Sequence, residues 1–194
     1  MKKEKVDKLI LIGSSTGGPN QLRFLLQDLE IKNTCIIVAQ HMIDRFIPSF
    51  VMQFNQHSIS EAVMLNDKEI LKNKIYICCK NTIITQGANS SGFAHIVSHW
   101  KEDKTDYSPN IDLLFDSAAK LTEKNKILAV ILTGMGDDGA KSLFKLHQAG
   151  AKCLAENEKD AVVFGMPKRA KQLNPNLKQM SLLEIKKEIL NFIK

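Results

Sequence analysis

The sequence has little cysteine, little proline and few aromatic residues, and it lacks any long hydrophobic run. Its four cysteines form no C-x-x-C pair, so we expect reduced thiols rather than a disulfide framework or a zinc site. Five prolines and ten glycines in 194 residues exclude collagen-like and low-complexity classes. The apolar run Leu9–Ile12 is too short for a signal peptide, and no run approaches a membrane span. We therefore expect a cytoplasmic protein without membrane insertion.

The remaining composition is that of an ordinary globular protein. Hydrophobic residues make up 44% of the chain and charged residues 25%, which argues against intrinsic disorder. A length of 194 residues suits one domain, and no linker-like stretch or internal repeat divides it. The net charge of +6 favours acidic partners, but alone it does not indicate a nucleic-acid-binding protein. We expect a single domain over residues 1–194 and no nucleic-acid partner.

Short buried strands alternate with helices along most of the chain. Apolar runs ended by glycine or polar residues predict strands, and apolar residues at helical spacing predict helices. We expect strands at residues 6–12, 35–39, 93–97, 127–132 and 152–155, and helices at 19–29, 46–54, 111–118, 140–148 and 181–193. An antiparallel β-hairpin is expected between about residues 73 and 98, with a turn at Lys80–Asn81. This order predicts a three-layer α/β/α fold with a mostly parallel, doubly wound sheet.

Polar and glycine-rich segments directly follow three of the predicted strands. They are Gly13–Gly18 (GSSTGG), Gln40–Met42 (QHM) and Thr133–Gly139 (TGMGDDG). In an open parallel sheet, ligands bind outside the carboxyl ends of the strands. A serine, a histidine and an aspartate from distant parts of the chain are therefore expected at one edge of the sheet.

This set of side chains is consistent with two kinds of site. A histidine can take the proton of a serine hydroxyl while a carboxylate orients the imidazole, which is the arrangement of an acyl-transfer triad. A glycine-rich turn before a helix is, however, more often a phosphate cradle, and His41 or the Asp137–Asp138 pair taken alone can be purely structural. Residue chemistry alone leaves open a serine hydrolase and a phosphate- or nucleotide-binding module. No P-loop lysine follows the glycines, where Pro19 and Asn20 stand.

The three segments, together with a later one, carry a resemblance to a known family. The later segment runs from Ala155–Glu158 to Val162–Pro167 (VVFGMP). In this order, over about residues 8 to 172, the chain resembles the catalytic domain of the CheB family of chemotaxis protein-glutamate methylesterases. The combination of the G-[AS]-S-T-G-G, Q-H-M and L-T-G-M-G-x-D-G motifs is highly specific.

The resemblance implies a reaction, a partner and a set of site residues. It implies hydrolysis of glutamate γ-methyl esters on the cytoplasmic helices of methylated chemoreceptors, with deamidation of receptor glutamines as a second activity. It assigns Ser15 as nucleophile, His41 as general base and Asp138 as orienting carboxylate, with Thr16 and the backbone of Met135 beside the nucleophile and oxyanion. No cofactor or metal is expected, and we expect a monomer.

The chain also departs from the family pattern in ways that affect these expectations. Residues 79–82 (CKNT) replace the usual Pro-Gly turn, Ile43 replaces a proline, and Ser108–Asn110 replace Arg-Pro-Ser. Family members commonly carry an N-terminal receiver domain, and we expect none on this chain. Activity is then expected to be constitutive or set by partners. A nucleotide-binding module and a non-catalytic receptor-binding adaptor are the alternatives.

Overall fold

Parallel strands form the central sheet of the computed structural model, which describes residues 6–88, 94–102 and 105–194. Seven described strands lie in this sheet, in the order β3 (Ala62–Leu65), β4 (Ile75–Cys78), β2 (Thr34–Gln40), β1 (Lys8–Ser14), β7 (Lys126–Ile131), β8 (Lys152–Glu156) and β9 (Lys178–Met180). Each neighbouring pair is parallel. The carboxyl ends of β1, β2 and β7 therefore meet at one edge of the sheet, as predicted.

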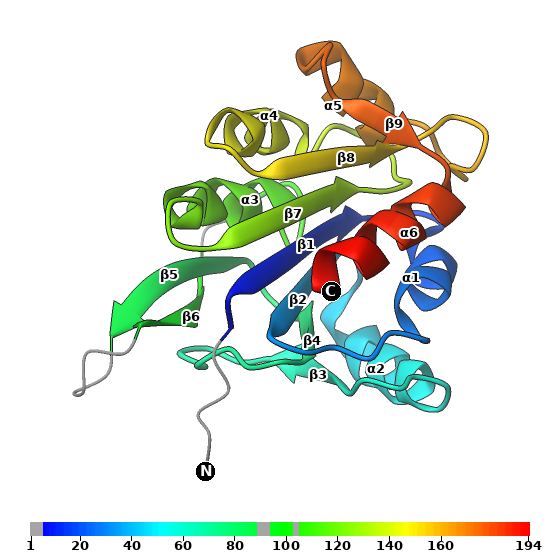
Figure 1. Ribbon diagram of the computed structural model, residues 1–194. Coiled ribbons are helices and arrows are strands. Elements are labelled where there is room, and N and C mark those ends of the chain that lie inside the picture. The colour runs from blue at the N-terminus through cyan, green and yellow to red at the C-terminus, as the bar shows by residue number, and fades with distance from the viewer. Residues whose placement is uncertain (1–5, 89–93, 103–104) are drawn as a thin grey trace.

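Helices cover both faces of the sheet (Figure 1). On one face lie α1 (Gly18–Leu26), α2 (Ile47–Asn55) and α6 (Leu182–Ile193), whose buried side chains share one hydrophobic cluster. On the other lie α3 (Ile111–Ala118), α4 (Ala140–Gln148) and α5 (Met166–Leu173), in a second cluster. The 3₁₀ turns η1 (Asp44–Phe46) and η2 (Ala119–Leu121) precede α2 and follow α3. The predicted three-layer α/β/α fold is confirmed.

The sequence of β1 shows why the sheet is buried on both faces. Leu9 and Leu11 belong to the cluster beneath α3 and α4, whereas Ile10 and Ile12 belong to the cluster beneath α1 and α6. Successive strand residues point to opposite faces, so a continuous apolar run requires cover on both sides. The same reasoning applies to β2, whose seven residues are all buried.

The predicted hairpin between residues 73 and 98 is wrong in its first strand. β4 pairs in parallel with β2 and β3, and the antiparallel pair is β5 (Thr82–Ala88) with β6 (Ala94–Trp100). All four residues of β4 are buried, which suits an interior strand of the main sheet. Lys80 and Asn81 lie in the connection between β4 and β5, where Asn81 is buried and its amide donates to Thr105 Oγ1 at 2.9 Å.

Several smaller elements were not predicted from the sequence. The edge strands β3 and β9 have four and three residues, too few to show a clear alternation. Helix α5 opens with Met166–Pro167 and buries only three side chains, so its apolar pattern is short. The strand predicted at 93–97 corresponds to β6, although Phe93 lies outside the described residues.

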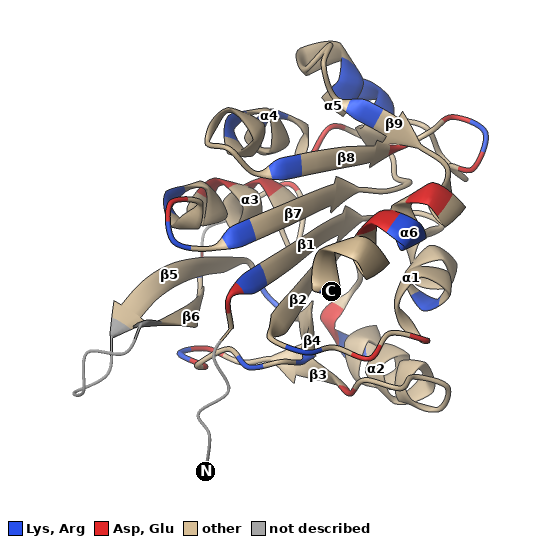
Figure 2. Cartoon of the chain, in the orientation of Figure 1, with Lys and Arg blue, Asp and Glu red and all other residues tan. Residues whose placement is uncertain are grey.

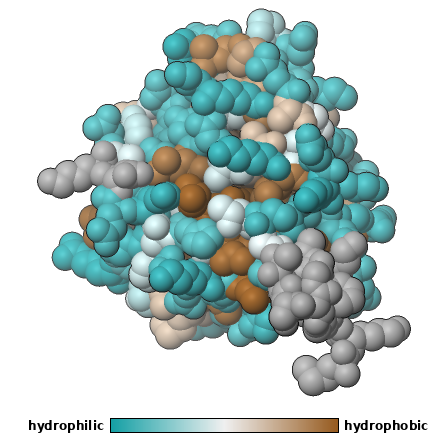
Figure 3. Space-filling model, turned by 90° about the vertical axis from the view of Figure 1, so that its left-hand side faces the viewer, coloured by the Kyte–Doolittle hydropathy of each residue, from teal (hydrophilic) through white to brown (hydrophobic). Residues whose placement is uncertain are grey.

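Positions of charged residues are spread along most of the ribbon in Figure 2. Helix α5 carries the basic residues Lys168, Arg169 and Lys171. The side at which β1, β7 and β8 begin is mostly hydrophilic, with separate hydrophobic patches (Figure 3). None of the helices in the described part of the chain combines the length and the apolar character needed to cross a membrane.

Candidate active site

An open pocket of about 760 Å³ lies at the carboxyl edge of the sheet. It is lined by residues from the loops after β1, β2 and β7 and from the loop before α3: Ser15, His41, Met42, Ile43, Asp44, Arg45, Asp106, Tyr107, Ser108 and Met135. Three residues expected at the site from the sequence, Ser15, His41 and Met135, are in this lining. The pocket is where a parallel α/β fold is expected to bind its ligand.

The turn between β1 and α1 places two adjacent serines in different surroundings. Ser14 is fully buried, and its hydroxyl donates to Gln40 Oε1 at 2.7 Å. Ser15 is half-buried in the pocket lining, and its N–H donates to the Thr133 carbonyl at 2.9 Å. Gly17 then turns the chain into α1 with φ 88°, a left-handed conformation that favours glycine. Only the second serine therefore has a hydroxyl that a ligand in the pocket can reach.

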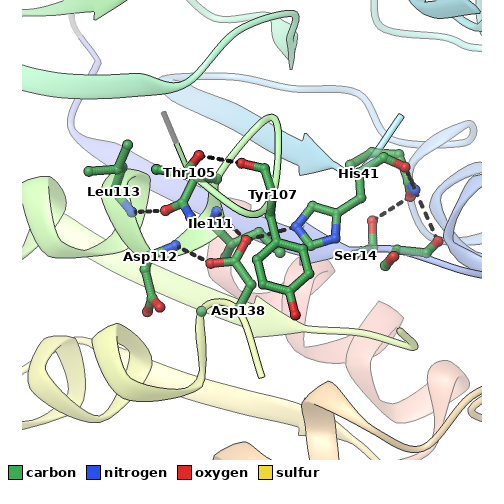
Figure 4. Close-up of polar contacts among 12 residues, drawn as sticks. Ser14, His41, Thr105, Tyr107, Ile111, Asp112, Leu113 and Asp138 are labelled. Carbon is green, nitrogen blue, oxygen red and sulfur yellow. Dashed lines mark hydrogen bonds and ion pairs between the residues drawn. The ribbon is translucent and has the colours of Figure 1, made fainter. Parts of the chain in front are cut away.

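His41 and Asp138 meet directly beside this turn. The distance from His41 Nε2 to Asp138 Oδ2 is 2.7 Å. A dashed line marks this contact in Figure 4. The Asp138 side chain is 1% exposed and the His41 side chain 12% exposed, so little water competes for the contact. Because Nε2 faces the carboxylate, Nδ1 is the nitrogen left for a second partner. Asp137, the neighbouring aspartate, is exposed.

The first turn of α3 holds the Asp138 carboxylate in place. Ile111 N–H donates to Oδ2 at 2.8 Å and Asp112 N–H donates to Oδ1 at 3.0 Å. These are among the backbone donors that a helix leaves unpaired at its amino end, where the helix dipole also favours a negative charge. The orientation of Asp138 is therefore fixed before any ligand binds.

The Gln40 side chain forms hydrogen bonds with both the serine turn and the backbone of His41. Its side-chain Nε2 donates to the carbonyls of Ser15 and His41, at 2.9 Å each, while Oε1 accepts from Ser14. Gly18 leaves room for this side chain, since a Cβ there would lie 2.1 Å from Gln40 Oε1. Sequence reasoning assigned Gln40 no role, although its place directly before His41 was the available signal.

The VVFGMP segment, residues 162–167, packs against the loop after β7 and positions it. Gly134 N–H donates to Val163 O at 2.9 Å, and Gly134 O accepts from the N–H groups of Gly165 and Met166. A Cβ on Gly134 would lie 2.3 Å from Met166 Sδ and 2.7 Å from Ser15 Cβ. The close packing of Ser15 on this loop therefore requires glycine at position 134.

Two backbone N–H groups in the loops after β1 and β7 have no acceptor among the described residues. Among the described residues, the N–H groups of Thr16 and Met135 donate to no other protein group. Thr16 follows Ser15 in the turn before α1, and Met135 lines the pocket with a 70% exposed side chain. Such donors can stabilise an oxygen that acquires negative charge next to the serine.

A second buried carboxylate lies behind the serine turn. Glu156, at the end of β8, is fully buried, and its Oε2 accepts from Thr133 N–H at 2.6 Å. Burial raises the pKa of Glu156 to about 7; hydrogen bonds from Thr133 N–H and the Gln21 amide oppose this rise, and Asp160 adds to it. Glu156 does not line the pocket.

The arrangement supplies three of the parts needed for acyl transfer: a hydroxyl, an imidazole oriented by a carboxylate, and backbone N–H donors. Ser15 and His41 line the same pocket, but no hydrogen bond joins their side chains. Such contacts are often loose without a ligand. In the described part of the chain, no group of three or more His, Cys, Asp or Glu side chains is placed to hold a metal.

Comparisons with known proteins agree with this geometry. Residues 10–189 match the family model described as CheB methylesterase. The chain belongs to the CheB methylesterase family. The crystal structure of the Thermotoga maritima CheB methylesterase catalytic domain superposes with a TM-score of 0.82 at 30% identity, covering 95% of this chain and 97% of that one.

Curated relatives carry a two-part name. A protein-glutamate methylesterase/protein-glutamine glutaminase of Photorhabdus laumondii is 35% identical over 95% of this chain, and one of Escherichia coli is 34% identical over the same share. The chain spans about half of each relative, 52% of its length. The shared half includes the serine turn, His41 and Asp138 of the present chain.

Proposed function

We propose that this chain is the catalytic domain of a protein-glutamate methylesterase that hydrolyses glutamate γ-methyl esters on chemoreceptors. The observation that carries the proposal is the 2.7 Å contact of His41 with Asp138 in the pocket that Ser15 lines. Deamidation of receptor glutamines is a second activity of the same site, because an ester and an amide differ only in the leaving group. The names of the relatives contain both activities.

In the proposed reaction, Ser15 Oγ attacks the ester carbonyl carbon while His41 Nδ1 accepts the hydroxyl proton. The imidazolium then gives this proton to the departing methoxy oxygen, which leaves as methanol, and an acyl-serine remains. Water attacks this ester with His41 as base again, and the glutamate carboxylate is released as Ser15 is re-protonated. With a glutamine side chain, ammonia leaves in place of methanol.

We further propose that the Thr16 and Met135 N–H groups bind the oxyanion of each tetrahedral intermediate. Neither donates to another described protein group, and Thr16 directly follows the nucleophile. Asp138 holds the proton on His41 Nε2 and stabilises the imidazolium. The close packing of Gly134 on Ser15 positions the loop that carries the Met135 N–H. No cofactor or metal takes part in this scheme.

The setting of the enzyme is proposed from the same observations. The partner is a chemoreceptor whose cytoplasmic helices present the ester to the open pocket, so the enzyme works in the cytoplasm. The 194 residues act as one catalytic domain and as a monomer. They need no phosphodonor for activity, because the pocket is already open at the surface.

The test is methanol release from methylated chemoreceptor, measured without a phosphodonor. Ser15→Ala should lower the rate by about four to six orders of magnitude with folding unchanged. Ser14→Ala is the matched control: it removes a buried hydrogen bond to Gln40 and should keep the rate within about tenfold. Full activity of Ser15→Ala would exclude the esterase mechanism. Saturable nucleotide binding without methanol release would favour a nucleotide-binding module, and receptor binding alone would favour an adaptor.

A further inference from the structure

A tyrosine outside the predicted triad lies flat against the imidazole of His41. The ring centroids of Tyr107 and His41 are 4.9 Å apart, and the ring planes differ by 8°. Tyr107 is half-buried and lines the pocket. In Figure 4 its phenol ring covers one face of the imidazole while an imidazole nitrogen meets Asp138. The stack therefore contacts the face of His41 and leaves its two nitrogens to other partners.

The loop after β7 leaves space for this ring. Gly136 has φ 86°, a left-handed conformation, and a Cβ there would lie 2.4 Å from the Tyr107 hydroxyl oxygen. A side chain at this position would push the phenol away from its place. The glycine between Met135 and Asp137 is thus required by the backbone and by the tyrosine together.

Hydrogen bonds tie Tyr107 to the helix start that holds Asp138. Thr105 Oγ1 donates to the Tyr107 carbonyl at 2.6 Å, and Asn81 Nδ2 donates to Thr105 Oγ1 at 2.9 Å. Asn81 Oδ1 accepts from Asn110 N–H at 2.9 Å, and Asn110 caps α3. The ring stacked on His41 and the carboxylate bonded to His41 are therefore positioned by one connected segment.

The stack supplies a restraint that Asp138 cannot supply alone. A hydrogen bond to one nitrogen still allows the imidazole to tilt, because the torsion about χ2 has a broad minimum. A parallel aromatic ring restricts this tilt, and its electron-rich face also stabilises the positive charge of an imidazolium. The second effect acts only in the protonated state of His41.

We propose that Tyr107 is a positioning residue for His41: its ring keeps the imidazole in the plane that connects Asp138 with the pocket, and it stabilises the imidazolium formed during turnover. The kinetic consequence rests on the esterase function proposed above. The orientation of the imidazole by the Tyr107 ring rests only on the observed stack, and it is expected in the chain without substrate as well.

The kinetic test compares two substitutions. Tyr107→Leu removes the aromatic ring and should lower kcat by about 10- to 30-fold while KM changes by less than about threefold. Tyr107→Phe keeps the ring and should retain kcat within about twofold. Phe24→Leu is the matched control, because Phe24 is a partly exposed aromatic on α1, in contact with Lys186 and outside the pocket. It should leave kcat unchanged.

A spectroscopic test needs no substrate. In ¹⁵N-labelled protein, the proton on His41 Nε2, hydrogen-bonded to Asp138, should give a low-field signal that is protected from exchange in the native chain and in Tyr107→Phe. Tyr107→Leu should broaden or remove this signal while the melting temperature shows a folded protein. Thr105→Val, which breaks the tie to the Tyr107 carbonyl, should weaken the signal and lower kcat several-fold.

The outcomes separate this role from the proposed function. If the native chain releases no methanol, the proposed esterase function is refuted. The Nε2 proton signal of Tyr107→Leu would still show whether the Tyr107 ring positions His41. If Tyr107→Leu keeps the Nε2 proton signal and a kcat within about twofold of the native value, the proposed role of Tyr107 is wrong. Loss in Tyr107→Phe equal to that in Tyr107→Leu would overturn it too, because the hydroxyl would then be responsible. If Tyr107→Leu does not fold, unchanged values in Thr105→Val overturn the proposal, and the expected losses support it.

Discussion

Two buried carboxylates lie at the carboxyl edge of the sheet, and they have different surroundings. Asp138 accepts hydrogen bonds from His41 and from two backbone N–H groups at the start of α3, and it reaches the pocket through the imidazole. Glu156 accepts from Thr133 N–H and from the Gln21 amide, and it does not line this pocket. Both are at most 2% exposed.

The difference shows that burial alone does not make a carboxylate a candidate for catalysis. Asp138 faces a base that becomes positive when it accepts a proton, so its charge has a function during turnover. Glu156 faces only neutral donors, and desolvation raises its pKa to about 7. We therefore expect substitution of the first to affect activity and substitution of the second to affect stability.

The largest expected effect is on activity, in Asp138→Asn. The asparagine amide would donate to His41 Nε2, so the imidazole proton would move to Nδ1, the nitrogen that must act as base. We expect kcat for methanol release to fall by about 10³- to 10⁴-fold. Asp137→Asn, at the exposed neighbour, is the matched control and should stay near native activity. An equal loss in both variants would contradict the assignment of Asp138.

The next effect is on stability, and it depends on pH. The folded-state pKa of Glu156 is about 7, above its ordinary value of 4.5, so the folded chain holds this proton more tightly. The free energy of unfolding should therefore decrease as pH rises from about 4.5 to about 7, by on the order of 3 kcal/mol from this group.

Glu156→Gln should lack this decrease, because glutamine does not ionise and its amide oxygen still accepts from Thr133 N–H. The measurement is urea unfolding of both proteins at pH 5 and pH 8. The difference between them should grow with pH in favour of Glu156→Gln, while activity at neutral pH stays within a few-fold. A constant difference at both pH values would show that Glu156 does not titrate in this window.

The smallest expected effect concerns the helix that holds Asp138. Asn110 caps α3 by accepting from Leu113 N–H at 2.8 Å, and Asn110→Ala should lower the free energy of unfolding by about 1 kcal/mol. Because the next two N–H groups bind Asp138, kcat should also fall several-fold. Ser181→Ala removes the capping box of α6, and Ser181 does not line the pocket. This variant should lower the free energy of unfolding by a similar amount and leave kcat unchanged. Equal kcat in both variants would show that the Asn110 cap does not affect the active site.

Much of this protein was predictable from local sequence. The apolar runs of β1, β2 and β7 require a sheet covered on both faces, and such a sheet is parallel when helices connect its strands. Parallel strands carry the segments that follow them to one edge. A serine, a histidine and an aspartate were therefore expected at that edge, and the resemblance to the CheB family selected Ser15, His41 and Asp138 among them. Their catalytic roles stay predictions.

Only the tertiary structure decided which elements and which atoms meet. β4 was predicted to pair with β5, its neighbour in sequence, but it pairs with β2 and β3, because its four buried residues need neighbours in the main sheet. The nitrogen of His41 that faces Asp138, and the ring of Tyr107 on its face, follow from loops distant in sequence. Hydrophobic periodicity determines which faces of a segment are buried, whereas the partner on each face depends on long-range packing that no local pattern encodes.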